Sequence, residues 1–126
     1  MHKFPYIKGS PKITAKLSTK AGVFKYFQML VDSGADYTII SRSDALFLDI
    51  EYDKIGTPEK RLEFGNLAIL HAKSTPLTIW IRDEEFTIPV LVVNGNVECT
   101  LGRKGVFDNF DILFQERKQQ VLFKRV

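Results

Sequence analysis

Short runs in which apolar and polar residues alternate dominate the first part of the chain. Residues 12–19 read KITAKLST, with an apolar residue at every second position from Ile13 to Leu17, which is the period of a strand with one buried face. The aromatic-rich run 23–31 follows after a Lys-Ala-Gly sequence that favours a turn. The two runs therefore predict a β-hairpin that ends just before Asp32.

The second half of the chain has the same character. Two strand-like runs within 75–93 flank the polar sequence 82–85 and predict another hairpin. Residues 89–93 are nearly all apolar, as expected of a strand that is buried on both faces. An Asn-Gly pair at 94–95 is a strong turn signal. Residues 111–126 then predict two further strands, joined around 115–119.

Helical signals occur in two places. Residues 41–48 have a helix-forming composition, and Ser41 or Ser43 can cap the first turn. Residues 103–110 predict a turn or two of helix. A chain of 126 residues suits one domain. We therefore expect a single all-β domain over residues 1–126 with two short helices.

Composition and charge narrow the classes of function. The net charge is +3, but the basic residues are scattered, which is typical of a solvated surface rather than of a nucleic-acid interface. Phe24, Tyr26 and Phe27 lie near Lys20 and Lys25, but alternating strand positions point to opposite faces. The N-terminal residues MHKFPYIKGSPK lack the apolar segment typical of a secretory leader, and no apolar run in the sequence is long enough to cross a bilayer. We therefore expect a cytoplasmic protein with no membrane or nucleic-acid partner.

The sequence has one cysteine, Cys99, and two histidines, His2 and His71. A single cysteine cannot form an intramolecular disulfide, and no ligand spacing surrounds either histidine. We therefore expect no metal and no cofactor. Free cysteines are commonly buried, so Cys99 is expected to be a small core residue rather than a nucleophile.

The most informative segment reads LVDSGADYT, residues 30–38. The carboxylate of Asp32 follows the apolar end of a predicted strand, and a turn of small residues follows it. Gly34 permits a close backbone approach that a Cβ would forbid, so this turn can hold a carboxylate rigidly and let another group come near. An Asp-Ser-Gly triplet alone is most often a plain turn. A second motif at 100–103, Thr-Leu-Gly-Arg, follows another apolar run and makes the pair more specific.

Together, LVDSGADYTII (30–40) and LGRKGVFDNFDILF (101–114) resemble the retropepsin type of aspartic protease. These are single-domain dimeric peptidases of retroviruses that also occur in bacteria and archaea. The resemblance covers nearly the whole chain, and its second motif looks closer to stand-alone cellular members than to viral ones. It implies an acid-protease fold with a closed, barrel-like half, which hydrolyses peptide bonds as a homodimer without a cofactor.

The resemblance makes Asp32 the catalytic residue. Ser33 would bond across the dimer, while Gly34 and Ala35 would line the floor beneath the substrate backbone. Metal-free hydrolysis needs one group that activates water and another that protonates the leaving amine, and two carboxyl groups that share a proton can do both. Because the chain has one such triplet, the second carboxyl must come from a second copy, on a two-fold axis.

Further roles follow from the same resemblance. Asp36 would meet the substrate main chain and pair with Arg103, Gly102 would pack against the Asp32 loop, and Thr38 would support that loop from behind. The family also covers its substrate with a glycine-rich hairpin. The best candidate for the tip of this flap is the sequence Phe64, Gly65, Asn66 and Leu67.

The dimer contact is expected to come from the C-terminal hairpin 111–125. Its alternating apolar residues, among them Phe114 and Phe123, suggest an apolar face with an open edge that pairs with another chain. We expect Phe123 to be buried at this interface. The N-terminal residues 1–8 lack clean alternation and predict a poor interface strand, so their deletion is expected to leave the dimer largely intact.

Two other classes of function stay open. A dimer with this fold can bind peptides without cutting them, and a peptidase assay on the wild type and Asp32→Asn separates these alternatives. A nucleic-acid-binding β domain is suggested only by the basic pI of about 9.0, and it would require a face that combines aromatic and basic side chains.

Overall fold

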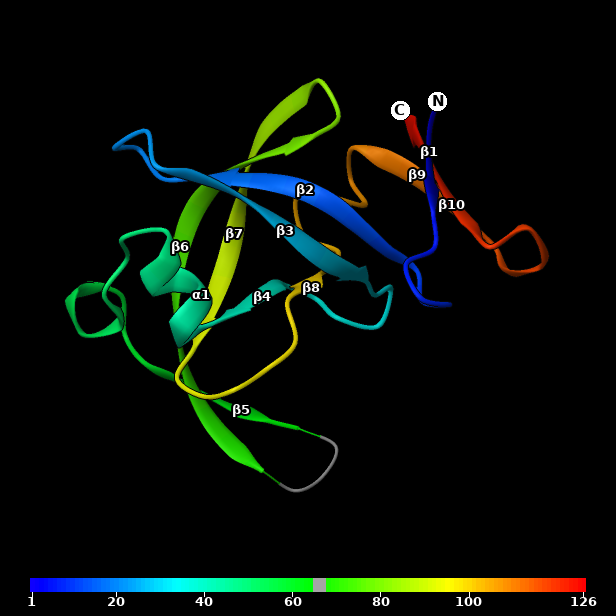
Figure 1. Ribbon diagram of the computed structural model, residues 1–126. Helices are drawn as coiled ribbons and strands as arrows, with labels where there is room; N and C mark the ends of the chain where they lie inside the picture. Colours follow the sequence, from blue (N-terminus) through cyan, green and yellow to red (C-terminus); the bar gives the residue numbers. More distant parts are fainter. Residues whose placement is uncertain (65–67) are drawn as a thin grey trace.

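The computed structural model describes residues 1–64 and 68–126, which form mostly β-strands (Figure 1). The strands are β1 (His2–Pro5), β2 (Lys12–Ser18), β3 (Phe24–Val31), β4 (Thr38–Ser41), β5 (Lys60–Glu63), β6 (Ile69–Ile81), β7 (Glu84–Val93), β8 (Thr100–Leu101), β9 (Phe110–Gln115) and β10 (Gln120–Arg125). The helical segments are α1 (Arg42–Phe47) and two single 3-10 turns, η1 (Tyr52–Lys54) and η2 (Glu116–Lys118). The all-β fold class is confirmed.

The larger sheet closes on itself. Its strand order is β2-β3-β8-β4-β7-β6-β5, and β2 pairs a second time with β6. Both predicted hairpins are present: β2 pairs with β3 through a turn in which Gly22 has a φ of 84°, and β6 pairs with β7 through a turn in which Arg82 has a φ of 57°. The long β6 and β7 strands cross the molecule and carry much of its core (Figure 1).

The C-terminal part of β7, residues 90–93, is buried on both faces, as its continuous apolar sequence predicts. Val90 and Val92 belong to the main core, whereas Leu91 and Val93 belong to a second cluster with Ala72. The alternation follows from the two-residue period of a strand. This second cluster lies on the side of β7 where the candidate site is found.

One parallel strand pair, β3 and β8, brings the sequence motifs together. Leu30 and Val31 of β3 pair with Thr100 and Leu101 of β8, so both strands end at the same edge of the sheet. The residues that follow them are Asp32 and Gly102. Because parallel strands carry their carboxyl ends to one edge, the two motifs meet although they are far apart in the sequence.

The two termini form a separate sheet with the order β1-β10-β9 (Figure 1). The predicted C-terminal hairpin is present as β9 and β10. The N-terminal segment, expected to be a poor interface strand, pairs with β10 of its own chain. Phe4 is 4% exposed there, so deletion of residues 1–8 would open the core.

The prediction that Phe123 lies at the dimer interface is wrong. Its side chain is fully buried within one copy of the chain, with its ring centroid 5.3 Å from that of Phe4 and 5.5 Å from that of Phe110. The reason is that the face of the terminal sheet that carries Phe123 packs against the main core. The exposed apolar residues of this sheet are Leu113 and Phe114 on β9.

One of the two predicted helices is present. Helix α1 begins after Ser41, whose Oγ accepts the Asp44 backbone N–H at 3.1 Å. Residues 103–109 form successive turns instead of the second helix, because Gly105 has a φ of 78°, outside the helical region. No helix in the described part of the chain has the length and apolar character needed to span a membrane.

Candidate active site

Asp32 lies at the end of β3, on a loop that the chain holds at both ends. Its backbone N–H donates to the Leu101 carbonyl at 3.1 Å, which anchors the loop to β8. The backbone N–H of Gly34 donates to Asp32 Oδ1 at 2.8 Å and fixes the carboxylate. A Cβ at Gly34 would lie 3.2 Å from the same oxygen, so a glycine leaves room for this approach.

Backbone hydrogen bonds join the Asp32 loop to the second motif. The Arg103 N–H donates to the Ala35 carbonyl at 2.9 Å, and the Lys104 N–H donates to the Asp36 carbonyl at 2.8 Å. The Gly102 N–H donates to the hydroxyl of Thr38 at 3.2 Å. The structure thus brings together the residues that the two motifs singled out.

Gly102 packs directly on the backbone of the first motif. A Cβ at this position would lie 2.2 Å from the Tyr37 carbonyl oxygen and 2.9 Å from the Thr38 nitrogen. Real side chains do not approach backbone atoms so closely, so this contact requires glycine. Thr38 itself is fully buried beneath the loop.

The predicted pair of Asp36 and Arg103 is present but loose. The Arg103 Nη1 atom lies 3.9 Å from Asp36 Oδ1, and the two side chains are 60% and 73% exposed, respectively. Solvent screens an ion pair of this kind strongly. The packing of the two loops therefore depends on their backbone contacts far more than on this side-chain pair.

A groove of about 920 Å³ runs past Asp32. It is lined by the loop residues Gly34 and Ala35 and by an apolar wall, and two carboxylates, Glu63 and Glu98, also reach it. The wall consists of Leu30, Ile39, Phe64, Leu70 and Val97. Apolar walls with a few polar groups are typical of ligand sites.

The structure describes the two strands of the candidate flap and one of its four predicted tip residues, Phe64. Strands β5 and β6 form a hairpin that pairs Lys60 with Ala72 and Glu63 with Ile69. Phe64 directly follows β5 and lines the groove that also contains Asp32. The other predicted tip residues, Gly65, Asn66 and Leu67, lie outside the described residues.

Sequence reasoning missed a polar cluster next to the groove. Lys104 Nζ donates to the phenol oxygen of Tyr37 at 2.9 Å, and this bond lowers the pKa of Tyr37 and raises the pKa of Lys104. Lys60 of β5 also lies over the Tyr37 ring, at 5.3 Å from its centroid. Tyr37 lies inside the quoted motif, but nothing in the sequence signals its two lysine neighbours.

Cys99 is buried, as predicted, and is 9% exposed. Burial raises the pKa of its thiol to about 12, with smaller contributions from the negative charges of Asp44 and Glu98. At neutral pH the thiol is therefore protonated and a poor nucleophile.

Among residues 1–64 and 68–126, no group of three or more His, Cys, Asp or Glu side chains is arranged to hold a metal ion.

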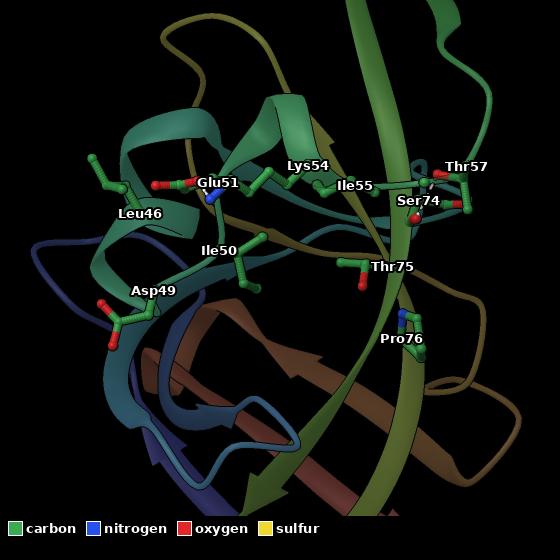
Figure 2. A pocket seen from close by; sticks show the side chains of 11 residues that line it. Leu46, Asp49, Ile50, Glu51, Lys54, Ile55, Thr57, Ser74, Thr75 and Pro76 are labelled. Atoms are coloured by element: carbon green, nitrogen blue, oxygen red, sulfur yellow. Dashed lines mark hydrogen bonds and ion pairs between the residues drawn. The ribbon is translucent and has the colours of Figure 1, made fainter.

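A second pocket, of about 720 Å³, lies between the α1–η1 segment and β6 (Figure 2). Leu46, Asp49 and Glu51 come from one side, and Thr75 and Pro76 come from the other. Glu51 forms an ion pair with Lys54 at 2.7 Å, and the Thr57 hydroxyl donates to the Ser74 carbonyl at 2.8 Å. With these polar groups already engaged and Asp32 elsewhere, this pocket is not the candidate site.

Comparisons with known proteins identify the fold through solved structures rather than through sequence. No family model and no curated protein matches the sequence. Among solved structures, a retropepsin-like aspartic protease from Rickettsia conorii has a similar structure, with a TM-score of 0.69 and 16% sequence identity. The match covers 97% of this chain and 88% of the Rickettsia chain. The EIAV protease in complex with the inhibitor HBY-793 also has a similar structure, with a TM-score of 0.53 and 17% sequence identity. This match covers 77% of this chain and 85% of the EIAV protease chain. The protein therefore has the retropepsin-like fold.

Proposed function

We propose that this protein is an aspartic endopeptidase and that two copies of the chain complete one active site. The observation that carries the proposal is the Asp32 carboxylate, which the Gly34 N–H holds at 2.8 Å and which lines an open groove with an apolar wall. The fold supports it, since both solved structures described above are proteases.

The chemistry requires a second carboxyl group. In the proposed reaction, the ionised Asp32 of one chain accepts a proton from a water molecule as the water oxygen adds to the scissile carbonyl carbon. The protonated Asp32 of the other chain donates to the carbonyl oxygen. Collapse of this adduct breaks the C–N bond as one carboxyl proton passes to the departing amine. A hydroxyl proton of the adduct passes to the other carboxylate as the product carbonyl forms, so the pair again holds one shared proton.

Asp32 and its loop are suited to a two-fold contact. Ser33 and Gly34 are exposed, so a second loop can approach, and the Ser33 hydroxyl is the group expected to bond across the axis. Backbone groups of Asp32, Ala35 and Asp36 are already bonded to residues 101–104. A dimer would therefore bring together two preformed halves.

The dimer contact that we propose lies at an edge of the terminal sheet. Strand β9 is at one edge of the order β1-β10-β9, and Leu113 and Phe114 are exposed on it. At the other edge, Arg82 donates to the Lys3 carbonyl at 2.6 Å, which covers part of β1. We propose that two copies associate through β9, because an uncovered strand edge with apolar side chains favours pairing.

A peptidase assay on wild type and Asp32→Asn tests the function. The substitution keeps the shape of the side chain and removes its titration, so hydrolysis is expected to fall to background while folding and dimerisation persist. Full activity in Asp32→Asn would remove the proposal. Binding of peptides by a wild-type dimer that cleaves none would instead support the non-catalytic alternative.

A further inference from the structure

We infer that the Tyr37 end of the Asp32 groove selects substrates with an acidic side chain, and that Lys60 and Lys104 are the residues that determine this preference. The inference rests on the proposed peptidase function and names a feature of its substrates. Tyr37, Lys60 and Lys104 are called the cationic site below.

The cationic site is assembled from three parts of the chain. Tyr37 follows Asp36 in the active-site loop, Lys104 follows Arg103 in the second motif, and Lys60 begins β5 of the candidate flap hairpin. Lys104 Nζ lies 2.9 Å from the Tyr37 phenol oxygen and 4.3 Å from the ring centroid. Lys60 Nζ lies 5.3 Å from the same centroid. One ring thus holds two ammonium groups at the junction of both loops and the hairpin.

This site is joined to the apolar wall of the groove through the second buried cluster, and its own three residues lie outside the groove lining. Tyr37 packs on the buried cluster of Ala72, Leu91 and Val93, together with Leu62 of the hairpin. Three further residues packed on that cluster, Ile39, Leu70 and Val97, also line the groove beside Asp32. A substrate that lies along this wall therefore meets the two lysines beyond the apolar stretch.

Both ammonium groups have capacity for another acceptor. Lys60 and Lys104 are exposed, and in the described residues neither forms an ion pair with a carboxylate. The nearest carboxylate on the loop, Asp36, is paired with Arg103 at 3.9 Å. An ammonium carries three N–H donors, and the Tyr37 phenol takes only one from Lys104. A carboxylate that reaches the site would gain hydrogen bonds from charged donors.

The charges near Asp32 have the opposite sign. Glu63 and Glu98 line the groove there, and Glu98 pairs with Lys12 at 3.0 Å. Like-charge repulsion disfavours a substrate carboxylate beside these residues. The acidic side chain is therefore expected at a position removed from the scissile bond, toward Tyr37. A two-fold dimer would present the same preference on both sides of the cleavage point.

A set of peptides with single Gln→Glu exchanges at successive positions tests the inference. We expect kcat/KM to rise at least about threefold for Glu at one position on each side, since surface ion pairs are of modest strength. The rise should shrink with added salt and disappear in the double variant Lys60→Gln/Lys104→Gln. A matched control, Lys20→Gln/Lys118→Gln, removes the same charge from exposed turns whose residues do not line the groove, and it should keep the preference.

The outcomes separate this inference from the peptidase proposal. Cleavage of the Gln peptides with no Glu preference at any position, or a preference that survives in Lys60→Gln/Lys104→Gln, overturns the cationic site and leaves the peptidase intact. If no peptide is cleaved, the peptidase proposal fails and fluorescence anisotropy of labelled Glu and Gln peptides decides the inference. Tighter Glu binding that is lost in the double variant supports it, and the absence of such a difference overturns it.

Discussion

The Asp32 loop and the terminal sheet are both folded within one copy of the chain, but they differ in what a second copy would contribute. Hydrogen bonds from Asp32, Arg103 and Lys104 satisfy the loop's backbone within the chain, whereas its proposed chemistry needs a second carboxyl. The terminal sheet buries Phe123 completely within the chain, whereas β9 is an edge strand that pairs with no second strand among the described residues. Both regions are therefore packed within one copy of the chain. A partner would add a carboxyl group at the Asp32 loop and a neighbouring strand at the terminal sheet.

The sharpest test of this comparison places a charge on the β9 edge. Leu113 is 54% exposed, so Leu113→Lys should leave the fold intact, while a lysine on an edge strand disfavours pairing with another chain. We expect the dimer dissociation constant to rise at least about tenfold, because two copies of the charge enter a two-fold contact. Activity at low protein concentration should fall in parallel, as measured by sedimentation and peptidase assay.

Leu46→Lys is the matched control for Leu113→Lys. Leu46 is 59% exposed on α1, away from the terminal sheet, so this variant should dimerise like the wild type. Unchanged dimerisation of Leu113→Lys would show that β9 is not the contact.

Phe123→Ala tests whether this ring is a core residue of one copy. The change removes a fully buried aromatic ring that contacts Phe4 and Phe110, and such truncations lower the free energy of unfolding by about 3–5 kcal/mol. Urea unfolding at several protein concentrations measures it. Phe24→Ala, at a ring that is 51% exposed, should cost about 1 kcal/mol or less. If Phe123→Ala lowers only the affinity of the dimer and leaves the stability of one copy unchanged, Phe123 is an interface residue and not a core residue.

Gly102→Ala tests the backbone contact between the two motifs. The new Cβ would lie 2.2 Å from the Tyr37 carbonyl oxygen, so one loop must shift, and overpacking of this kind costs about 1–3 kcal/mol. We expect lower stability and lower activity together. At Gly56 an added Cβ meets nothing within 4 Å, so Gly56→Ala should change stability by about 1 kcal/mol or less. Equal behaviour of the two variants would contradict the role given to Gly102.

The smallest expected effect belongs to the exposed pair of Asp36 and Arg103. Arg103→Ala removes a guanidinium partner at 3.9 Å from a 73% exposed carboxylate, and the free energy of unfolding should fall by only about 0–1 kcal/mol. Thermal unfolding of Arg103→Ala beside Gly102→Ala measures the difference. A larger loss from Arg103→Ala would mean that side-chain charge, rather than backbone packing, holds the two loops together.

Local sequence patterns predicted much of this architecture. The alternating runs located both central hairpins, and the continuous apolar run at 89–93 predicted a strand with two buried faces. Ser41 predicted the start of α1. The paired motifs predicted that Asp32 and Gly102 would meet, and the structure brings them together. These features depend on neighbouring residues or on a resemblance carried by short segments, so the sequence alone contains them.

Other features depended on contacts between distant segments. Alternation in β10 shows that Phe123 shares a face with Val121, but only the packing of that face on the main core decides that the ring is buried within one copy. The positive φ of Gly105, which replaces the second predicted helix by turns, arises where the residue packs against Ile88. Lys60 and Lys104 meet at Tyr37 because β5 and the second motif converge on the Asp32 loop. The sequence determined the strands and the catalytic candidate, and the tertiary structure decided which faces are covered and which charges gather beside the groove, because both depend on how the strands pack in space.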